Sequence, residues 1–315
     1  QTVDDFEVIV VDDGSTDGTR PMLRRMLDAT SMDLTIVENE TNLGANPSRN
    51  RGIELARGSL IAFLDSDSIP EPEWAARIRA PFEEASVASV TGGVDDPEPR
   101  SWSDLTYRGT HRLPGPGPAR RLAGCNMCVR ADLLRRHMLD ADMNQHRLDA
   151  SGRPSAAVSS GCDEEGIYLR LKAEGHRQVV EPSARVLHVH HYTFRTLWKQ
   201  AWRGGRSAAQ LVYKYHLPHR VDMVPFLAGY LSLPLGLLHP WLWAVPVAAF
   251  GLALAAITYN DLFLKGKTVM QTVVTFPLLL VYYQVRLAGY VWETVLLRAR
   301  GSSIERVRLV RRGAA

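Results

Sequence analysis

Residues 6–18 read FEVIVVDDGSTDG, and residues 60–67 read LIAFLDSD. Each stretch begins with a run of apolar residues, which is typical of a strand buried in a sheet. Each run ends in an acidic cluster, with Asp12 and Asp13 in the first stretch and Asp65 and Asp67 in the second. Ligands of α/β sheets bind beyond the carboxyl ends of the strands, so both clusters are candidates for one ligand site.

Helical patterns alternate with these strands along the chain. Residues 21–27 and 47–57 predict helices, and residues 34–37 predict a short strand between them. The order strand, helix, strand, helix, strand predicts an α/β fold with a mostly parallel central sheet. Further strands are predicted over residues 87–92 and 179–191. Residues 100–124 are rich in Gly, Pro and Arg and predict a long mobile loop.

The acidic clusters suggest a chemistry. Asp65 and Asp67 repel each other, and a divalent cation would relieve that repulsion. Oxygen ligands suit Mg²⁺ or Mn²⁺, with the diphosphate of a substrate completing the shell. Asp13 could accept hydrogen bonds from a nucleobase or a ribose. Asp-Asp-Gly-Ser is also an ordinary turn sequence, and this plainer interpretation stays open for either cluster alone.

The chain resembles the family 2 glycosyltransferases of the GT-A fold. The resemblance spans roughly residues 1–205 and rests on an ordered set of segments. These are residues 6–18, 42–58 (NLGANPSRNRGIELARG), 61–70 (IAFLDSDSIP), 123–130 (AGCNMCVR), 163–175 (DEEGIYLRLKAEG) and 182–188 (PSARVLH).

The resemblance implies roles for particular residues. A nucleotide-sugar donor would be bound by Asp12, Asp13, Ser15, Arg49 and Asp65. Asp65 and Asp67 would hold Mg²⁺ or Mn²⁺ at the donor diphosphate, and His188 stands where some relatives present a histidine near the metal. The catalytic base would come from the pair Asp163 and Glu164. Relatives usually read Glu-Asp there, so either member of this pair is a candidate base.

Two departures from the family pattern bear on function. The family normally opens with a further strand and helix of roughly thirty residues, and we expect their absence to leave a bare sheet edge and an open pocket wall. Residues 200–204 read QAWRG, which keeps the Gln and Arg of the Gln-x-x-Arg-Trp signature of processive synthases but lacks the final Trp. This favours a non-processive transferase.

The cysteines and histidines allow a second metal hypothesis. Cys125, Cys128 and Cys162 together with a histidine are zinc ligands by type, but the spacing between them is unusual for a zinc site. We interpret the cysteines as structural thiols in a reducing compartment. A packed or surface histidine remains the alternative for His188.

The C-terminal third indicates a membrane. Residues 223–260 form a run of 38 residues without Asp, Glu, Lys or Arg, and residues 268–285 form a second run of 18. Such runs are long enough for membrane spans. The first run is either one span with an interfacial approach helix or a hairpin turning near His239 and Pro240. The basic tail, residues 298–315, follows the positive-inside rule on the cytosolic side if there are two spans, which we favour over three.

These features give a domain plan. We expect an N-terminally incomplete GT-A domain (1–191), an amphipathic interfacial helix region (192–222), a transmembrane region (223–297) and a basic cytoplasmic tail (298–315). A helix packing on the catalytic domain is the alternative for residues 192–215. The net charge of +3 is too small to indicate a nucleic-acid partner.

The functional prediction follows from the resemblance and the apolar runs. We expect a multi-pass protein of the cell membrane with a cytoplasmic catalytic domain. It would be an inverting, metal-dependent glycosyltransferase that uses a nucleotide-sugar donor and a carbohydrate or lipid-linked hydroxyl acceptor in contact with membrane lipids. The alternatives are a polyprenyl-phosphate glycosyltransferase and a catalytically dead, nucleotide-binding membrane scaffold.

Overall fold

The computed structural model describes residues 1–113, 115–143, 164–218, 224–299, 304–307 and 309. The chain divides into two compact units, each built from separate stretches of sequence. The first unit comprises Gln1–Asp95, Leu113–Val189 and Arg308–Ala315 and holds every described strand. The second comprises Asp96–Arg112 and His190–Val307, and its described secondary structure is helical.

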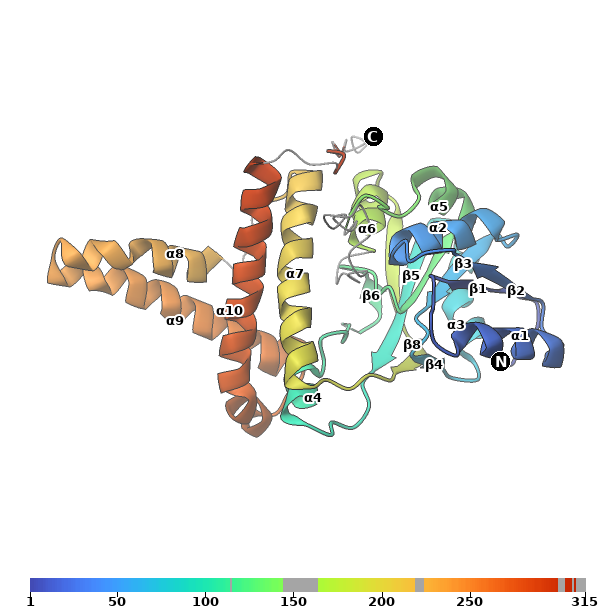
Figure 1. Cartoon of the computed structure of the whole chain (residues 1–315), viewed down its shortest axis with the longest axis horizontal. Coiled ribbons are helices and arrows are strands. Elements are labelled where there is room, and N and C mark those ends of the chain that lie inside the picture. Colours follow the sequence, from blue (N-terminus) through green and yellow to red (C-terminus); the bar gives the residue numbers. More distant parts are fainter. Residues whose placement is uncertain (114, 144–163, 219–223, 300–303, 308, 310–315) are drawn as a thin grey trace. The chain divides into compact units, whose positions relative to one another are not determined.

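The strands of the first unit form two sheets (Figure 1). In the smaller sheet β1 (Val8–Asp12) pairs in parallel with β2 (Leu34–Glu38). The larger sheet has the order β3-β7-β5-β8-β4, with β6 beside β8. Its strands are β3 (Leu60–Leu64), β4 (Ser68–Pro70), β5 (Val87–Asp95), β6 (Gly117–Pro118), β7 (Asn126–Arg130) and β8 (Arg177–His188).

The expected α/β architecture is confirmed, but the expectation of a mostly parallel central sheet needs correction. Within the larger sheet, β5 and β8 are parallel, whereas β3–β7, β5–β7, β4–β8 and β6–β8 are antiparallel. The reason is that β7 inserts between β3 and β5 from a later part of the chain and runs against both. The sheet is therefore mixed.

Helices cover both faces of the larger sheet. On one face Met127 and Val129 of β7 pack with α2 (Ala45–Leu55), α5 (Ala131–His137) and α6 (Glu165–Ala173). On the other face Cys128 packs with α3 (Trp74–Arg79) and the 3₁₀ helix η1 (Ala80–Glu83). This alternation follows from the strand period of two. Helix α1 (Thr19–Ala29) connects β1 to β2.

Residues 100–124 are more ordered than the sequence suggests. They contain α4 (Trp102–Tyr107) and β6, so the expectation of a loop throughout this stretch is wrong. The side chain of Ser101 accepts a hydrogen bond from the backbone N–H of Asp104 at 3.0 Å and caps α4. The Ser-x-x-Asp pattern of residues 101–104 is a helix start signal, but the many Gly, Pro and Arg residues around it favoured a loop prediction.

Two long helices dominate the second unit. α7 (Phe194–Tyr215) lies alongside α10 (Val269–Ala299), as Figure 1 shows. Thr193 and Thr196 form a capping box that begins α7. Gly205 lets the two backbones approach closely, because a Cβ there would stand 2.0 Å from the carbonyl oxygen of Arg286. The inner face of α7 is therefore a helix-packing face whose partner is α10. The expected interfacial position of this helix, like its alternative of packing on the catalytic domain, stays a prediction.

The first apolar run is broken in the middle. It forms α8 (Val224–Ser232) and η2 (Leu233–Leu237), then η3 (Pro240–Trp243) and α9 (Ala244–Tyr259), which continues into the π-helix η4 (Asn260–Leu264). α8 and α9 lie side by side, with the rings of Tyr230 and Phe250 5.2 Å apart (Figure 1). The chain thus reverses near His239 and Pro240, which is the hairpin geometry of the second sequence interpretation.

Two helical segments among the described residues are long and apolar enough to cross a membrane. They are Pro240–Leu264, with 25 residues, and Val269–Ala299, with 31 residues. Val224–Leu237 is apolar but shorter, and an α-helix of that length would span about 21 Å of a hydrocarbon core about 30 Å thick. Length and composition support the expected membrane region, and the number of crossings stays a prediction.

The connection between these two long segments carries buried charge. Asp261 is fully buried, and its carboxylate contacts Lys265 Nζ at 2.9 Å and Lys267 Nζ at 2.8 Å. Lys267 also donates a hydrogen bond to the carbonyl oxygen of Thr106 in α4 at 2.9 Å. The connection between the two long segments therefore attaches α4 to the helices of the same unit.

Candidate functional site

The first acidic cluster lies where β1 ends. Asp12 is buried, and its Oδ2 accepts hydrogen bonds from Ser15 N at 3.2 Å and Arg20 Nε at 2.7 Å. Burial alone would raise the pKa of Asp12, but the hydrogen bonds from Ser15 and the Arg20 guanidinium outweigh it and hold the pKa below its ordinary value. Asp12 Oδ1 is buried without a hydrogen-bond partner in the described part of the chain. Asp12 is thus negatively charged and held in place, and its Oδ1 atom can accept a further hydrogen bond.

Asp13 supports the neighbouring loop. Its carboxylate accepts hydrogen bonds from Leu43 N at 2.7 Å, Gly44 N at 2.8 Å and Asn39 Nδ2 at 2.9 Å. Gly14, at a φ of +77°, packs against the same loop, since a Cβ there would stand 2.6 Å from Asn42 N. Asp13 therefore holds the turn before α2 in place. Its expected contact with a nucleoside stays a prediction.

The second acidic cluster follows β3 and meets two other elements. Arg49 of α2 donates a hydrogen bond through Nη2 to Asp65 Oδ1 at 2.8 Å. Because Ser68 of β4 pairs with His188 of β8, Asp67 comes beside the end of β8. His188 Nε2 lies 3.0 Å from Asp67 Oδ1. The expected metal residues Asp65, Asp67 and His188 are therefore brought together.

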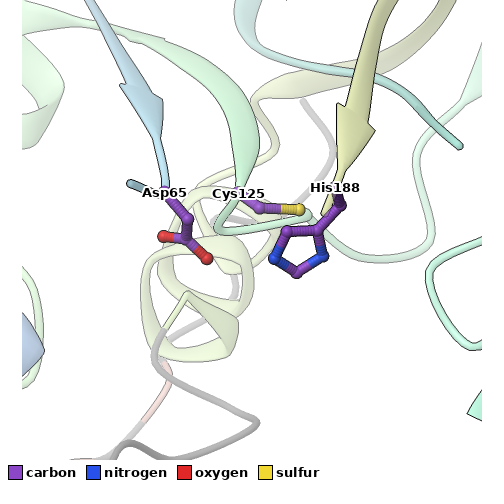
Figure 2. A group of neighbouring side chains, drawn as sticks. All are labelled: Asp65, Cys125 and His188. Atoms are coloured by element: carbon purple, nitrogen blue, oxygen red, sulfur yellow. The ribbon is translucent and has the colours of Figure 1, made fainter. Parts of the chain in front are cut away.

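Cys125 joins this group from the residue just before β7. One ligand atom each of Asp65, Cys125 and His188 lies within 4.8 Å of the others. Figure 2 shows the three side chains facing one another from the ends of separate segments. Cys125 was expected to be a structural thiol, with a zinc site formed by the three cysteines and a histidine as the alternative. No local pattern in the sequence predicts its place beside Asp65 and His188. Cys128 fits that expectation, because it is buried in the core beneath α3.

Glu164 completes the site at the N-terminal end of α6. A Cβ on Gly124 would stand 3.1 Å from Glu164 Oε2 and 3.7 Å from Arg49 Nη2, so the carboxylate and the guanidinium both lie against this glycine. Burial raises the pKa of Glu164, and the negative charge of Asp65 adds to the rise, while Arg49 and Arg121 oppose it. Its predicted partner Asp163 lies outside the described residues. A carboxylate with a raised pKa beside a metal-type cluster can act as a general base.

The charges of the site suit a divalent cation. Asp65, Asp67 and Glu164 bring negative charge to one edge of the larger sheet, and Arg49 bonds directly to Asp65. Such an excess of carboxylates is relieved by a bound cation with oxygen ligands. The residues present therefore fit Mg²⁺ or Mn²⁺, which Asp65 and Asp67 would hold.

The N-terminal part of the chain matches a known protein family. Residues 1–133 match the family model described as glycosyl transferase family 2. This part of the chain is therefore similar to a family 2 glycosyltransferase domain. The matched residues include the predicted donor residues Asp12, Asp13, Ser15, Arg49 and Asp65 and the predicted metal residue Asp67. His188 and the predicted base pair Asp163 and Glu164 lie outside the match.

Curated relatives of this domain match over shorter stretches. Glycosyltransferase AglE of Haloferax volcanii is 37% identical over 90 residues, which cover 29% of this chain and 29% of that protein. Dodecaprenyl-phosphate galacturonate synthase of Rhizobium johnstonii is 41% identical over 68 residues, covering 22% of this chain and 20% of that protein. Each alignment therefore spans less than a third of the relative.

A solved structure supports the fold of the glycosyltransferase domain. The mannosyltransferase PcManGT from Pyrobaculum calidifontis, solved in complex with GDP-Man and Mn²⁺, superposes with a TM-score of 0.56 at 19% identity. The superposition covers 91% of this chain and 78% of that one. The predicted GT-A fold is confirmed.

Proposed function

We propose that this chain transfers a sugar from a nucleotide-sugar donor to a hydroxyl acceptor, with a divalent cation and with inversion at the anomeric carbon. The observation that carries the proposal is the meeting of Asp65, Asp67 and Glu164 at one edge of the larger sheet. The similarity of residues 1–133 to glycosyl transferase family 2, which includes Asp65 and Asp67, supports the proposal. A structural role alone would not gather three carboxylates at one site, because each adds to the others' repulsion.

The donor would lie against the ends of β1 and β3. Asp12, with its unbonded Oδ1, is the candidate acceptor of a hydrogen bond from the nucleoside. Asp65 and Asp67 would hold Mg²⁺ or Mn²⁺ at the diphosphate. When bound, the cation would neutralise the negative charge that develops on the departing nucleoside diphosphate. PcManGT, which was solved with GDP-Man and Mn²⁺, supports this assignment by its fold.

The acceptor would react beside Glu164. The carboxylate takes the proton of the acceptor hydroxyl, and that oxygen forms a bond to the anomeric carbon of the donor. The bond from this carbon to the diphosphate oxygen breaks on the opposite face, and its electron pair leaves with the nucleoside diphosphate. The configuration is therefore inverted. Arg49 bonds to Asp65 on the donor side and lies against Gly124, which is beside Glu164. It would therefore keep the donor and the base in a fixed relative position.

A direct assay tests this function. The full chain, purified in detergent, is incubated with Mn²⁺, a panel of UDP- and GDP-sugars and a membrane-lipid extract, and release of nucleoside diphosphate is measured. We expect release that depends on one donor and on the lipid extract. Glu164→Gln should abolish it, whereas the neighbouring variant Glu165→Gln should not. Equal activity of the Glu164→Gln variant and the original chain would contradict the proposal.

A polyprenyl phosphate is the second candidate acceptor. It is favoured by the similarity to a dodecaprenyl-phosphate galacturonate synthase and by the apolar helices of this chain. Such an acceptor is already an anion and needs no strong base. Radiolabelled sugar should then enter the organic phase with added polyprenyl phosphate, and the Glu164→Gln variant should retain most of that transfer.

The membrane assignment belongs to the same proposal. We infer that the helices over residues 223–297 anchor the chain in the cell membrane and that the transferase domain faces the cytosol. The apolar segments Pro240–Leu264 and Val269–Ala299 support this anchoring. A catalytically dead scaffold would bind nucleotide sugars without releasing nucleoside diphosphate, so the same release assay separates it from both enzymes.

A further inference from the structure

Cys125 has no part in the proposed reaction, although its thiol lies in the site. The residue is 4% exposed, and its sulfur forms no disulfide. One ligand atom each of Asp65, Cys125 and His188 lies within 4.8 Å of the others (Figure 2). His188 is itself 8% exposed. A sulfur, a nitrogen and an oxygen ligand therefore converge from β3, the start of β7 and the end of β8.

This set of donors differs from the oxygen-only set that suits Mg²⁺ or Mn²⁺. Thiolate and imidazole ligands select Zn²⁺ and similar thiophilic cations. In a tetrahedral zinc site with bonds of about 2.0–2.3 Å, neighbouring ligand atoms lie roughly 3.5 Å apart. Side-chain movements of about an ångström would bring the three residues to that spacing. Three protein ligands would leave the fourth position open.

We propose that Asp65, Cys125 and His188 form a site for a thiophilic divalent cation, with Zn²⁺ as the expected ion. The contact between Asp67 Oδ1 and His188 Nε2 supports this proposal. Carboxylates that orient the ring of a metal-bound histidine in this way strengthen the site. Arg49 acts similarly on Asp65, because its hydrogen bond fixes one carboxylate oxygen and leaves the other for the ion.

The site shares Asp65 with the Mg²⁺ or Mn²⁺ position of the proposed transferase. Two divalent cations held at the same carboxylate would repel each other, so Zn²⁺ should displace the catalytic cation. This inhibitory consequence rests on the proposed function, whereas the binding of Zn²⁺ does not. Micromolar zinc would then arrest a transferase that is otherwise saturated with Mg²⁺ or Mn²⁺.

Titration with Co²⁺ tests the binding. Co²⁺ replaces Zn²⁺ in such sites and gives a thiolate-to-metal charge-transfer absorption when a cysteine is a ligand. The full chain in detergent should show this band, and equimolar Zn²⁺ should remove it. Cys125→Ser should abolish the band, and His188→Ala should weaken Co²⁺ binding by about 10-fold or more.

The other two cysteines provide matched controls. Cys128→Ser changes a second buried cysteine three positions along the same segment, and Cys162→Ser changes the remaining thiol. Both variants should keep the band. A band that survives in Cys125→Ser, or that disappears in Cys162→Ser, overturns the proposal, as does no band at all in the folded original chain.

A competition measurement separates this inference from the proposed function. Bound Mn²⁺ is followed by electron paramagnetic resonance while Zn²⁺ is added. Zn²⁺ should release Mn²⁺ from the original chain at a concentration at least about 10-fold lower than from Cys125→Ser. If the Co²⁺ band forms but no donor is consumed, the proposed function fails and the zinc site stands. If transfer occurs and the Zn²⁺ dependence of Mn²⁺ release is the same in both chains, the zinc site fails alone.

Discussion

Substitutions of Asp65 and Asp67 test the metal hypothesis most directly. Replacing either by Asn should lower turnover by about 10²- to 10⁴-fold, because charge stabilisation at the leaving group is lost. Circular dichroism checks that each variant is folded. EDTA should abolish activity of the original chain, and Mn²⁺ or Mg²⁺ should restore it. Full activity in EDTA would remove the metal from the mechanism.

Glu164 should determine the pH dependence of transfer to a hydroxyl acceptor. Its base form is the carboxylate, so kcat/KM should rise with pH through the pKa of Glu164. Because burial and Asp65 raise this pKa, the increase in kcat/KM should occur at a higher pH than the ordinary pKa of a glutamate would give. Arg121→Gln removes an opposing positive charge and should move the rise to higher pH. The neighbouring Arg120→Gln is the control. A pH profile that is the same in both variants as in the original chain would indicate another base.

Asp13 should matter for stability as well as for any nucleotide. Asp13→Ala removes the acceptor of three hydrogen bonds and leaves the amides of Leu43 and Gly44 unbonded. We expect a loss of about 2–3 kcal/mol in the free energy of unfolding. Thermal unfolding measures this, with Asp28→Ala on the exposed side of α1 as a control. Equal melting temperatures of the two variants would show that the loop does not depend on Asp13.

At the residue scale, local patterns predicted most of the candidate site. Asp12, Asp65 and Glu164 each stand at the end of a strand or at the start of a helix, and such positions can be located from a short stretch of sequence. The position of Cys125 could not be predicted in the same way. Its neighbours Asp65 and His188 come from strands that are not adjacent to it in sequence, so their meeting depends on the order of strands in the sheet.

At the scale of elements, the pair Gly204 and Gly205 in α7 provides a matched comparison. A methyl group on Gly205 would collide with the carbonyl oxygen of Arg286, whereas a methyl group on Gly204 would meet nothing within 4 Å. Gly205→Ala should therefore separate α7 from α10 and cost about 1–3 kcal/mol. Gly204→Ala should stabilise α7 by up to about 1 kcal/mol, because alanine favours a helix.

Thermal unfolding of both alanine variants in the same detergent measures the difference. The melting temperatures should change in opposite directions. A shared direction would mean that packing against α10 does not limit the size of residue 205. Both substitutions add one methyl group to the same turn of the same helix, so their hydrophobicity and length effects cancel in the comparison.

The strands β1, β2, β3, β5 and β8 and helices such as α1 and α2 were predicted because apolar runs and turn residues are local signals, whereas β4, β6 and β7 were not predicted. The pairing of β7 between β3 and β5 could not be predicted, since strand order is decided by contacts far apart in sequence. α4 was missed for a different reason. It has six residues, and its flanking Gly, Pro and Arg residues dominate the composition of any window long enough to reveal a helix.

For the whole molecule, the membrane crossings can be counted with a reporter fused after Ala315. We expect two crossings, at Pro240–Leu264 and Val269–Ala299, which return the basic tail to the cytosol. Green fluorescent protein should then be fluorescent and alkaline phosphatase inactive at that position. The reverse result would mean that Val224–Leu237 also crosses, despite its length, and that α8 and α9 form a transmembrane hairpin.

The hydrogen bond from Lys267 to Thr106 has a consequence for the order of events during synthesis. Residues 96–112 belong to the helical unit, yet the ribosome adds Thr106 to the chain 161 residues before Lys267 and still earlier than α10. Until Lys267 has emerged, the contacts of this segment are limited to earlier residues such as Tyr192, which bonds to Asp104, and Gln200, which bonds to Tyr107. A chain released after residue 222 should expose it to protease, whereas the full chain should protect it. Assembly of the protein would then finish only when its last long helix has been made.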